Sequence, residues 1–402
     1  MKASLGTIFT ILFSVLCFSL SFIGDTHYAI PNGINILLVL MFPFVVSKHQ
    51  LLKGFTKKPF IYFSIFLFFL LFKSILFGHF LDDISIIKKL FQALLIIILS
   101  FALSEKSVLL LKQSFIFGSL SAIIYSCYKL GYNFSEINSF DFTKGPLINA
   151  TLPVQRLYLG LLCTISLILS IEFLANTKRF NKKIFFSFIS LLFFGFVFFI
   201  AARIAIITVI LVLLYYLQLK LHRKLKIISF FSVLILTFFI VSITPTLSKR
   251  ILHSDDQALD TYFQKIQKHE PRYIIWSHSL SLIDKNHALF GYGFKGYQNQ
   301  LLKKYEKIPQ LKKREWFIEE QFNSHNQYLD VLLSQGLFGL ILLLLFLYSL
   351  FKESLRSDTK FLLFLSVIMF FMVYNNFHRV IGVFIFALIY SLIVIPNKIE
   401  HK

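Results

Sequence analysis

The sequence predicts an all-α protein that crosses a membrane many times. Of its 402 residues, 56% are hydrophobic and 15% are charged, whereas a soluble domain carries about 25% charged residues. The mean hydropathy is +0.73. Apolar runs of about 20 residues recur from end to end, and a helix of that length crosses a hydrocarbon core of about 30 Å. The alternating pattern of barrel strands does not occur, so the spans are expected to be helices.

Twelve apolar segments are predicted to span the membrane. Their approximate bounds are 5–23, 34–46, 60–77, 90–103, 108–128, 154–174, 184–200, 204–219, 227–243, 328–351, 361–373 and 380–395. The first follows a lysine but is followed by Gly24-Asp25-Thr26-His27 rather than by a small-residue cleavage pattern, so we interpret it as an uncleaved span. Only Ala201-Ala202-Arg203 separates the seventh span from the eighth, which predicts a very tight turn.

Lysine and arginine residues concentrate in alternate connections between these spans. The basic connections contain Lys48, Lys53, Lys57 and Lys58; Lys178, Arg179, Lys182 and Lys183; Lys220, Arg223, Lys224 and Lys226; and Lys352, Arg356 and Lys360. Because such connections remain in the cytoplasm, both termini are predicted to be cytoplasmic. Much of the formal net charge of +21 therefore reflects topology, and it gives little support to nucleic-acid binding.

One long polar segment, residues 244–327, is predicted to lie outside the cytoplasm. Long segments are translocated whatever their charge, so its lysines do not oppose this placement. It contains a helix-like stretch at 272–283 and turn signals at Gly291-Tyr292-Gly293 and at Gly296, which predict a folded cap. The chain thus divides into a first bundle of about nine spans (1–243), a loop or cap (244–327) and about three C-terminal spans (328–402).

Two arginines could bind an anion at the outer surface. Arg203 stands at the outer edge of two apolar spans, either as a boundary residue that reaches the headgroups or as a fixed cation for a phosphate. Arg272 follows Pro271 in the first turn of a predicted helix, and a helix N-terminus favours an anion. The alternative for Arg272 is a surface ion pair with Glu270.

His325 lies between the polar segment and the tenth span, in the stretch Asn323-Ser324-His325-Asn326-Gln327-Tyr328-Leu329. Histidine ionises near neutral pH, which suits proton transfer at a water–lipid boundary. The structural alternative is that Asn323 or Ser324 caps the span and His325 only occupies its first turn. The other histidines show no metal-ligand spacing, so no metal site is predicted.

Four features together resemble the O-antigen ligase/polymerase superfamily of bacterial envelope enzymes. They are the layout of about twelve spans with one large late outer loop, and three motifs: Ala202-Arg203; Arg272-x-x-x-Trp276 followed by Gly291-Tyr292-Gly293; and His325-Asn326-x-Tyr328-Leu329 followed by Gly336-Leu337-Phe338-Gly339. The motifs cover roughly residues 203–340. Relatives often place Ser or Thr before the first arginine, where this chain has Ala201-Ala202.

The resemblance implies a metal-independent glycosyltransferase of the bacterial inner membrane, without a cofactor and with a helical GT-C-like fold. It would transfer a glycan from undecaprenyl pyrophosphate to a hydroxyl of lipid A-core, in lipopolysaccharide biosynthesis and facing the periplasm. His325 would be the base, and Arg203 and Arg272 would bind the pyrophosphate. Asn326, Tyr328, Trp276 and Arg156 are candidates for support. Arg314 and Arg379 are further outer-side arginines that could join the site.

Three other functions remain open on the sequence alone. An O-antigen or exopolysaccharide polymerase would use the same donor and extend another lipid-linked glycan. A protein O-oligosaccharyltransferase would need a groove for a peptide. A polysaccharide transporter would need polar residues along a path, and we counted only Lys73, Lys112 and Glu172 in or near the spans, which disfavours it.

Cysteines introduced singly into the connections test the topology. We expect positions in 48–58, 178–183, 220–226 and 352–360 to be protected from a membrane-impermeant thiol reagent in intact spheroplasts, and positions in 244–327 to react. Protection of the 244–327 segment would overturn both the orientation and the mechanism that depends on it.

Overall fold

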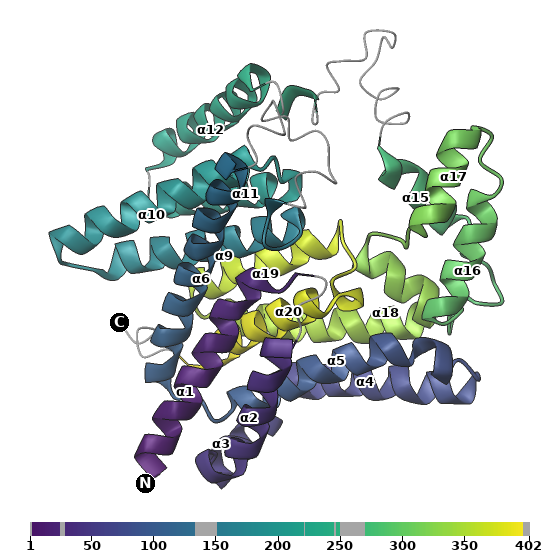
Figure 1. Cartoon of the computed structure of the whole chain (residues 1–402), viewed down its shortest axis with the longest axis horizontal. Coiled ribbons are helices and arrows are strands. Elements are labelled where there is room, and N and C mark those ends of the chain that lie inside the picture. The colour runs from purple at the N-terminus through teal and green to yellow at the C-terminus, as the bar shows by residue number, and fades with distance from the viewer. Residues whose placement is uncertain are drawn as a thin grey trace. The chain divides into compact units, whose positions relative to one another are not determined.

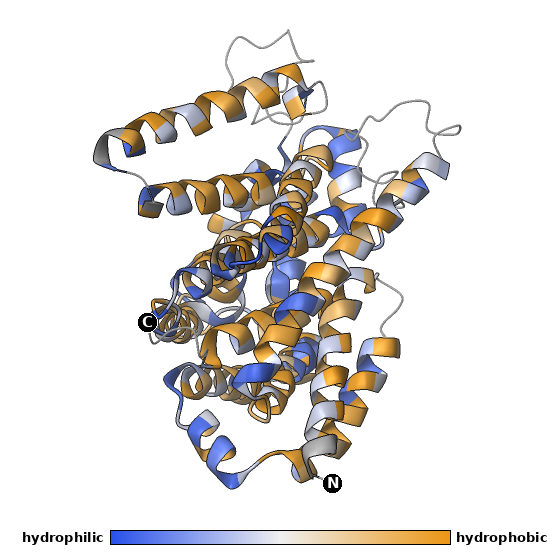
Figure 2. Ribbon diagram, turned by 90° about the vertical axis from the view of Figure 1, so that its left-hand side faces the viewer, coloured by the Kyte–Doolittle hydropathy of each residue, from blue (hydrophilic) through white to orange (hydrophobic). Residues whose placement is uncertain are grey.

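The described part of the chain is helical and contains no strand. A computed structural model describes residues 2–24, 29–132, 151–220, 222–244, 247–249 and 270–396 (Figure 1). Asp25, Thr26 and His27, on which the interpretation of the first run relied, lie outside the described residues, as do residues 250–269 of the long polar segment. Hydrophobic residues predominate along the long helices (Figure 2).

Seven helices of the described residues are long and apolar enough to cross a membrane. They are α1 with η1 (Lys2–Ser19 and Leu20–Phe22), α4 (Lys58–Leu76), α6 (Glu105–Tyr132), α9 (Arg156–Asn176), α10 (Phe180–Phe199), α12 (Arg223–Ile243) and α18 (Gln327–Ser354). An eighth span results if α2 (Ala29–Val45) and α3 (Lys48–Phe55), which meet at a bend of 115°, count as one. These helices confirm a polytopic α-helical membrane protein.

The four remaining predicted spans also fall on helices, but these are shorter or more polar. They are α5 (Phe80–Ser100), α11 (Arg203–Lys220), α19 (Asp358–Phe371) and α20 (Val380–Val394). α5 carries Asp82 and Asp83 in its first turn. α20 has only 15 residues, and all those from Ile381 onward are buried. The number of twelve spans therefore stays a prediction.

The chain forms two compact units, and the three consecutive parts expected from the sequence stay a prediction. Unit 1 comprises residues 1–6, 41–105 and 267–402, and unit 2 comprises residues 7–40 and 106–266. In unit 1, α20 packs against α5, α18 and α19. A helix that is apolar on every side is stable in such a central position because neighbouring helices cover it all round.

Unit 2 packs its helices closely at small residues and contains a buried ion pair. A Cβ on Gly160 of α9 would lie 2.9 Å from the side chains of Ala202 and Ala205, so α9 and α11 approach closely there. Lys112 of α6 donates to both carboxylate oxygens of Glu172 at 2.7 Å. As the sequence predicted, a tight turn joins α10 to α11, and Ala201 in it has a φ of +50°.

Contacts inside unit 1 sort its connections into two ends. At one end, Lys57 lies 3.6 Å from Glu353, and Gln50 donates to the carbonyl oxygen of Ala102 at 3.5 Å. At the other end, the backbone N–H of Lys295 donates to Asp83 at 3.1 Å. This sorting agrees with the alternation of basic and other connections expected from the sequence.

The described part of the long polar segment forms three helices: α15 (Pro271–Leu280), α16 (Phe294–Tyr305) and α17 (Leu311–Glu320). α15 matches the helix predicted at 272–283. Gly296 lies inside α16, so the turn predicted there is wrong. The turn predicted at Gly291-Tyr292-Gly293 is present, and both its glycines have positive φ angles.

α18 is broken at Gly336, and the segment before α16 fills the break. Gly336 has a φ of 70° and a ψ of −169°. The carbonyls of Leu333 and Ser334, released from the helix ladder, accept the N–H groups of Tyr292 and Gly293 at 2.8 Å. Buried Lys73 of α4 adds a third donor, at 2.7 Å from the Ser334 oxygen. Irregular backbone at membrane depth is tolerated when protein groups satisfy it in this way.

Gly336→Ala should prevent this crossing from forming. The added Cβ would lie 2.2 Å from the backbone oxygen of Leu289, and the positive φ is itself unfavourable for alanine. Overpacking alone costs about 1–3 kcal/mol, so we expect a large fall in the thermal unfolding temperature or in the yield of folded protein. Gly195→Ala in α10 is the control, because nothing lies within 4 Å of its Cβ. Equal stability of the two variants would contradict this account of the break.

Candidate functional site

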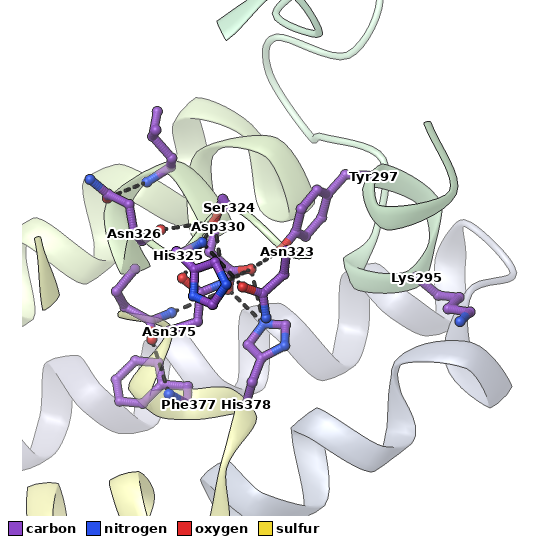
Figure 3. Close-up of polar contacts among 12 residues, drawn as sticks. Lys295, Tyr297, Asn323, Ser324, His325, Asn326, Asp330, Asn375, Phe377 and His378 are labelled. Atoms are coloured by element: carbon purple, nitrogen blue, oxygen red, sulfur yellow. Dashed lines mark hydrogen bonds and ion pairs between the residues drawn. The ribbon is translucent and has the colours of Figure 1, made fainter. Parts of the chain in front are cut away.

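A buried carboxylate, Asp330, is the centre of the densest polar network among the described residues of unit 1 (Figure 3). It accepts hydrogen bonds from Gln327 Nε2 at 3.2 Å and from Asn375 Nδ2 at 3.0 Å. The hydroxyl of Tyr297 in α16 also donates to it, and the Nε2 atom of His378 lies 3.0 Å away. Burial and the neighbouring carboxylate raise the pKa of Tyr297, so its hydroxyl keeps the proton that it donates.

The network fixes the connection between α19 and α20 against the start of α18. Asn375 also bonds with Ser324, and the backbone N–H of Phe377 donates to Gln327 Oε1 at 3.0 Å. Lys89 of α5 donates to the backbone oxygen of His378 at 2.8 Å. The 374–379 connection, which includes the short helix η3 (Asn376–His378), therefore has a defined position next to residue 325.

His325 lies just before α18, in a strained backbone conformation. Its φ is +44°, which non-glycine residues rarely adopt. Asn326 is the N-cap of α18, because its Oδ1 accepts the N–H groups of Tyr328 at 3.0 Å and Leu329 at 3.1 Å. The alternative in which Asn323 or Ser324 caps the helix and His325 occupies its first turn is therefore wrong. Strain of this kind concentrates at functional sites.

α15 brings Arg272 and Trp276 to the same place. The indole Nε1 of Trp276 donates to the backbone oxygen of Ser324 at 3.0 Å, next to His325. Arg272 is one helical turn before Trp276, so the two share a face of α15. The structure thus brings together three of the residues selected from the sequence: Arg272, Trp276 and His325.

The environment of His325 keeps its imidazole neutral. Burial is the main reason why the pKa of His325 falls to about 3, and three neighbouring basic residues add to the effect: Arg272, His378 and Arg379. Its Nδ1 atom is buried and has no hydrogen-bond partner within the described ranges. A ring nitrogen in this position is available to a donor group on a bound molecule.

Arg203 and Arg156 belong to unit 2. Each is the first residue of a helix, α11 and α9 respectively. Since Gly160 of α9 packs against Ala202, the beginnings of these two helices lie together. Ala201 and Ala202 are both buried in this contact region, which favours small side chains.

Two of the candidates for support make packing and capping contacts. Tyr328 packs against Phe371 of α19, with ring centroids 6.3 Å apart. Asn326 caps α18 and also donates through Nδ2 to the backbone oxygen of Met372 at 3.0 Å. Arg314 lies in α17 and is not one of the residues whose charge acts on His325.

The sequence analysis missed Asp330 and His378. The count of charged residues inside spans omitted Asp330, although it lies within the predicted span 328–351, and an acid in an apolar span indicates a partner nearby. His378 and Asn375 had no such signal, because their pairing with Asp330 crosses 48 and 45 residues of chain. Within the described ranges, no group of three His, Cys, Asp or Glu residues could hold a metal ion.

Comparison with known proteins gives one family. Residues 188–344 match the model of the family described as O-antigen ligase. The match contains Arg203, Arg272 and His325, and its C-terminal part includes the break at Gly336. No curated protein matches the chain.

Asp330→Asn should destabilise the protein. An asparagine offers one oxygen and one NH₂ group to four surrounding donor groups, so at least one buried donor loses its acceptor. That loss costs about 1–3 kcal/mol, and we expect a clear fall in the unfolding temperature of the purified protein. Asp82→Asn is the control, because Asp82 is exposed on α5 and its removal should change little. An unchanged unfolding temperature for Asp330→Asn would show that the network does not hold the site together.

Proposed function

We propose that this chain is an O-antigen ligase, because its residues 188–344 match the family model described as O-antigen ligase. It transfers a glycan from undecaprenyl pyrophosphate to a sugar hydroxyl of lipid A-core at the periplasmic face of the inner membrane. The observation that carries this proposal is the hydrogen bond from Trp276 to Ser324, which brings the helix of Arg272 to His325. A fixed guanidinium and a neutral imidazole are the groups that this transfer requires.

The transfer exchanges one bond at the anomeric carbon of the donor glycan. The acceptor oxygen forms a bond to that carbon, and the bond from the carbon to the pyrophosphate oxygen breaks. The acceptor hydroxyl gives its proton to His325. The leaving pyrophosphate gains negative charge, which arginine stabilises through paired N–H donors. Arg272 supplies this function, and Arg203 is the second candidate for it.

The low pKa of His325 in the empty protein fits this mechanism. At neutral pH the imidazole is unprotonated and ready to accept a hydrogen bond, but a group of such low pKa is a weak base. A bound pyrophosphate places negative charge near the same residues that lower the pKa of His325. That charge raises the pKa, so donor binding strengthens the base at the moment when it is needed.

Transfer measured in proteoliposomes with lipid-linked glycan and lipid A-core tests these roles. His325→Ala and His325→Gln should each lower transfer per inserted molecule by about 10²–10⁴-fold, the usual contribution of a general base. Arg272→Lys and Arg203→Lys should also lower transfer, because lysine keeps the charge but loses the fork. His49→Gln, in the exposed part of α3, is the matched control and should keep full activity.

The pH dependence gives an independent measure of His325. A lowered pKa means that protonation occurs only at acidic pH, so kcat/KM should not decline between pH 7 and pH 5 through this group. An inflection near the ordinary value of about 6.5, lost in His325→Gln, would show that the imidazole is solvated in the working enzyme. Full activity of His325→Gln would show that His325 only positions other groups. Glu319 and Glu320 would then be the next candidates for the base.

Cells that lack the protein distinguish the ligase from a polymerase of the same superfamily. A missing ligase leaves lipid A-core without attached glycan. A missing polymerase leaves single repeat units attached. Single units in the deletion strain would therefore replace the ligase proposal with the polymerase one.

A further inference from the structure

A second pocket lies at the end of unit 1 where Lys57 meets Glu353, away from His325. Its volume is about 190 Å³. Three chain segments form its wall: residues 50–57, residues 100–105 and residues 394–396. Its apolar surface comes mainly from Phe101, Leu103, Val394, Ile395 and Pro396.

The bend between α2 and α3 builds one side of this pocket. α3 turns 115° away from α2, and the side chains of Ser47 and Gln50 form a capping box that starts it. Gly54 lies so close to the ring of Phe101 that a Cβ would be 2.4 Å from it. α3 is thus fixed against the end of α5, with Lys53 exposed at the pocket.

Within the described ranges, two of the charged side chains that line the pocket are unpaired: one is a cation and the other an anion. Lys57 already has a partner, because it lies 3.6 Å from Glu353, a carboxylate that Arg356 also contacts at 3.1 Å from outside the pocket. Lys53 and Glu105 are both exposed and line the pocket, and neither has an ion-pair partner among the residues described here. A purely basic pocket would favour an anionic lipid, but this pocket is zwitterionic.

We propose that this pocket binds the headgroup of a phospholipid that carries a primary amine, with the phosphate at Lys53 and the ammonium at Glu105. The apolar wall accommodates the start of an acyl chain. An ammonium group donates N–H hydrogen bonds to a carboxylate, which a trimethylated amine cannot do. A headgroup with a phosphate and no amine would leave Glu105 facing a negative charge.

Glu105 also has a simpler role, since it is the first residue of α6, where an acid complements the helix dipole. That role does not involve Lys53 and predicts no lipid preference. The proposed lipid site is independent of glycan transfer, so the two proposals can fail separately.

Native mass spectrometry of the purified full chain in detergent tests the proposal. Dioleoyl phosphatidylethanolamine, phosphatidylglycerol and phosphatidylcholine are added in turn at equal concentration. We expect the ethanolamine lipid to be retained about three- to tenfold more than either of the others, the size expected for one partly exposed charge pair. Equal retention of the ethanolamine and glycerol lipids by the wild type would overturn the proposal.

Charge variants assign the preference to the two residues. Lys53→Glu should remove the selective retention, and Glu105→Lys should transfer the preference to phosphatidylglycerol. Glu105→Gln, a milder change, should equalise the ethanolamine and choline lipids. Lys58→Glu is the matched control, because Lys58 is exposed nearby but does not line the pocket. An equal loss in Lys58→Glu, or an unchanged preference in Glu105→Lys, would show that general surface charge and not this pocket selects the lipid.

Discussion

The buried carboxylate of Asp330 is tolerated because donors from separate parts of the chain surround it. A lone charge in the interior of a membrane protein is costly, and it persists only where partners satisfy it. Here Tyr297 comes from α16, Gln327 from α18, and Asn375 and His378 from the 374–379 connection. Each of these elements must be in place before the carboxylate is satisfied. The network therefore couples α16 and the 374–379 connection to the start of α18, and the position of His325 follows from that coupling.

The break in α18 is a second place where buried polar groups need partners. Here backbone groups supply the partners, rather than side chains. A straight helix would leave no room for residues 288–293. In this segment the N–H groups of Tyr292 and Gly293 donate to the carbonyls of Leu333 and Ser334. The backbones approach so closely that Gly291 and Gly336 cannot carry a Cβ without collision. The two glycine motifs noticed in the sequence are thus the two sides of one contact. Both motifs lie apart from His325 in the sequence, so we interpret them as residues that shape the fold. The catalytic proposal does not rely on them.

Features that depend on neighbouring residues were predicted correctly from the sequence. Features that depend on contacts between distant residues were missed. Each predicted span falls on a helix because hydropathy depends on neighbouring residues, and Pro271 correctly marked the start of α15. The cap of α18 was misplaced because Asn323, Ser324 and Asn326 are all good N-cap residues. Gly296 was read as a turn, although packing of α16 outweighs the modest helix cost of one glycine. The sequence around His378 gives no indication that its partner is a carboxylate 48 residues earlier.

The electrostatics of the site link binding to chemistry. In the empty protein, burial and three basic neighbours all disfavour the imidazolium form of His325. The same basic neighbours favour an anion, so in the proposed mechanism the groups that attract the phosphate also weaken the base until the phosphate is bound. A base that gains strength only with the donor bound avoids being protonated beforehand at mildly acidic pH. In the proposed mechanism Arg272 has two effects: it holds the leaving group, and its charge adds to the burial that lowers the pKa of His325. We therefore expect Arg272→Lys to lower the rate clearly and to change the pH profile only slightly. Lysine keeps the charge that acts on the imidazole but loses the paired donors that act on the phosphate.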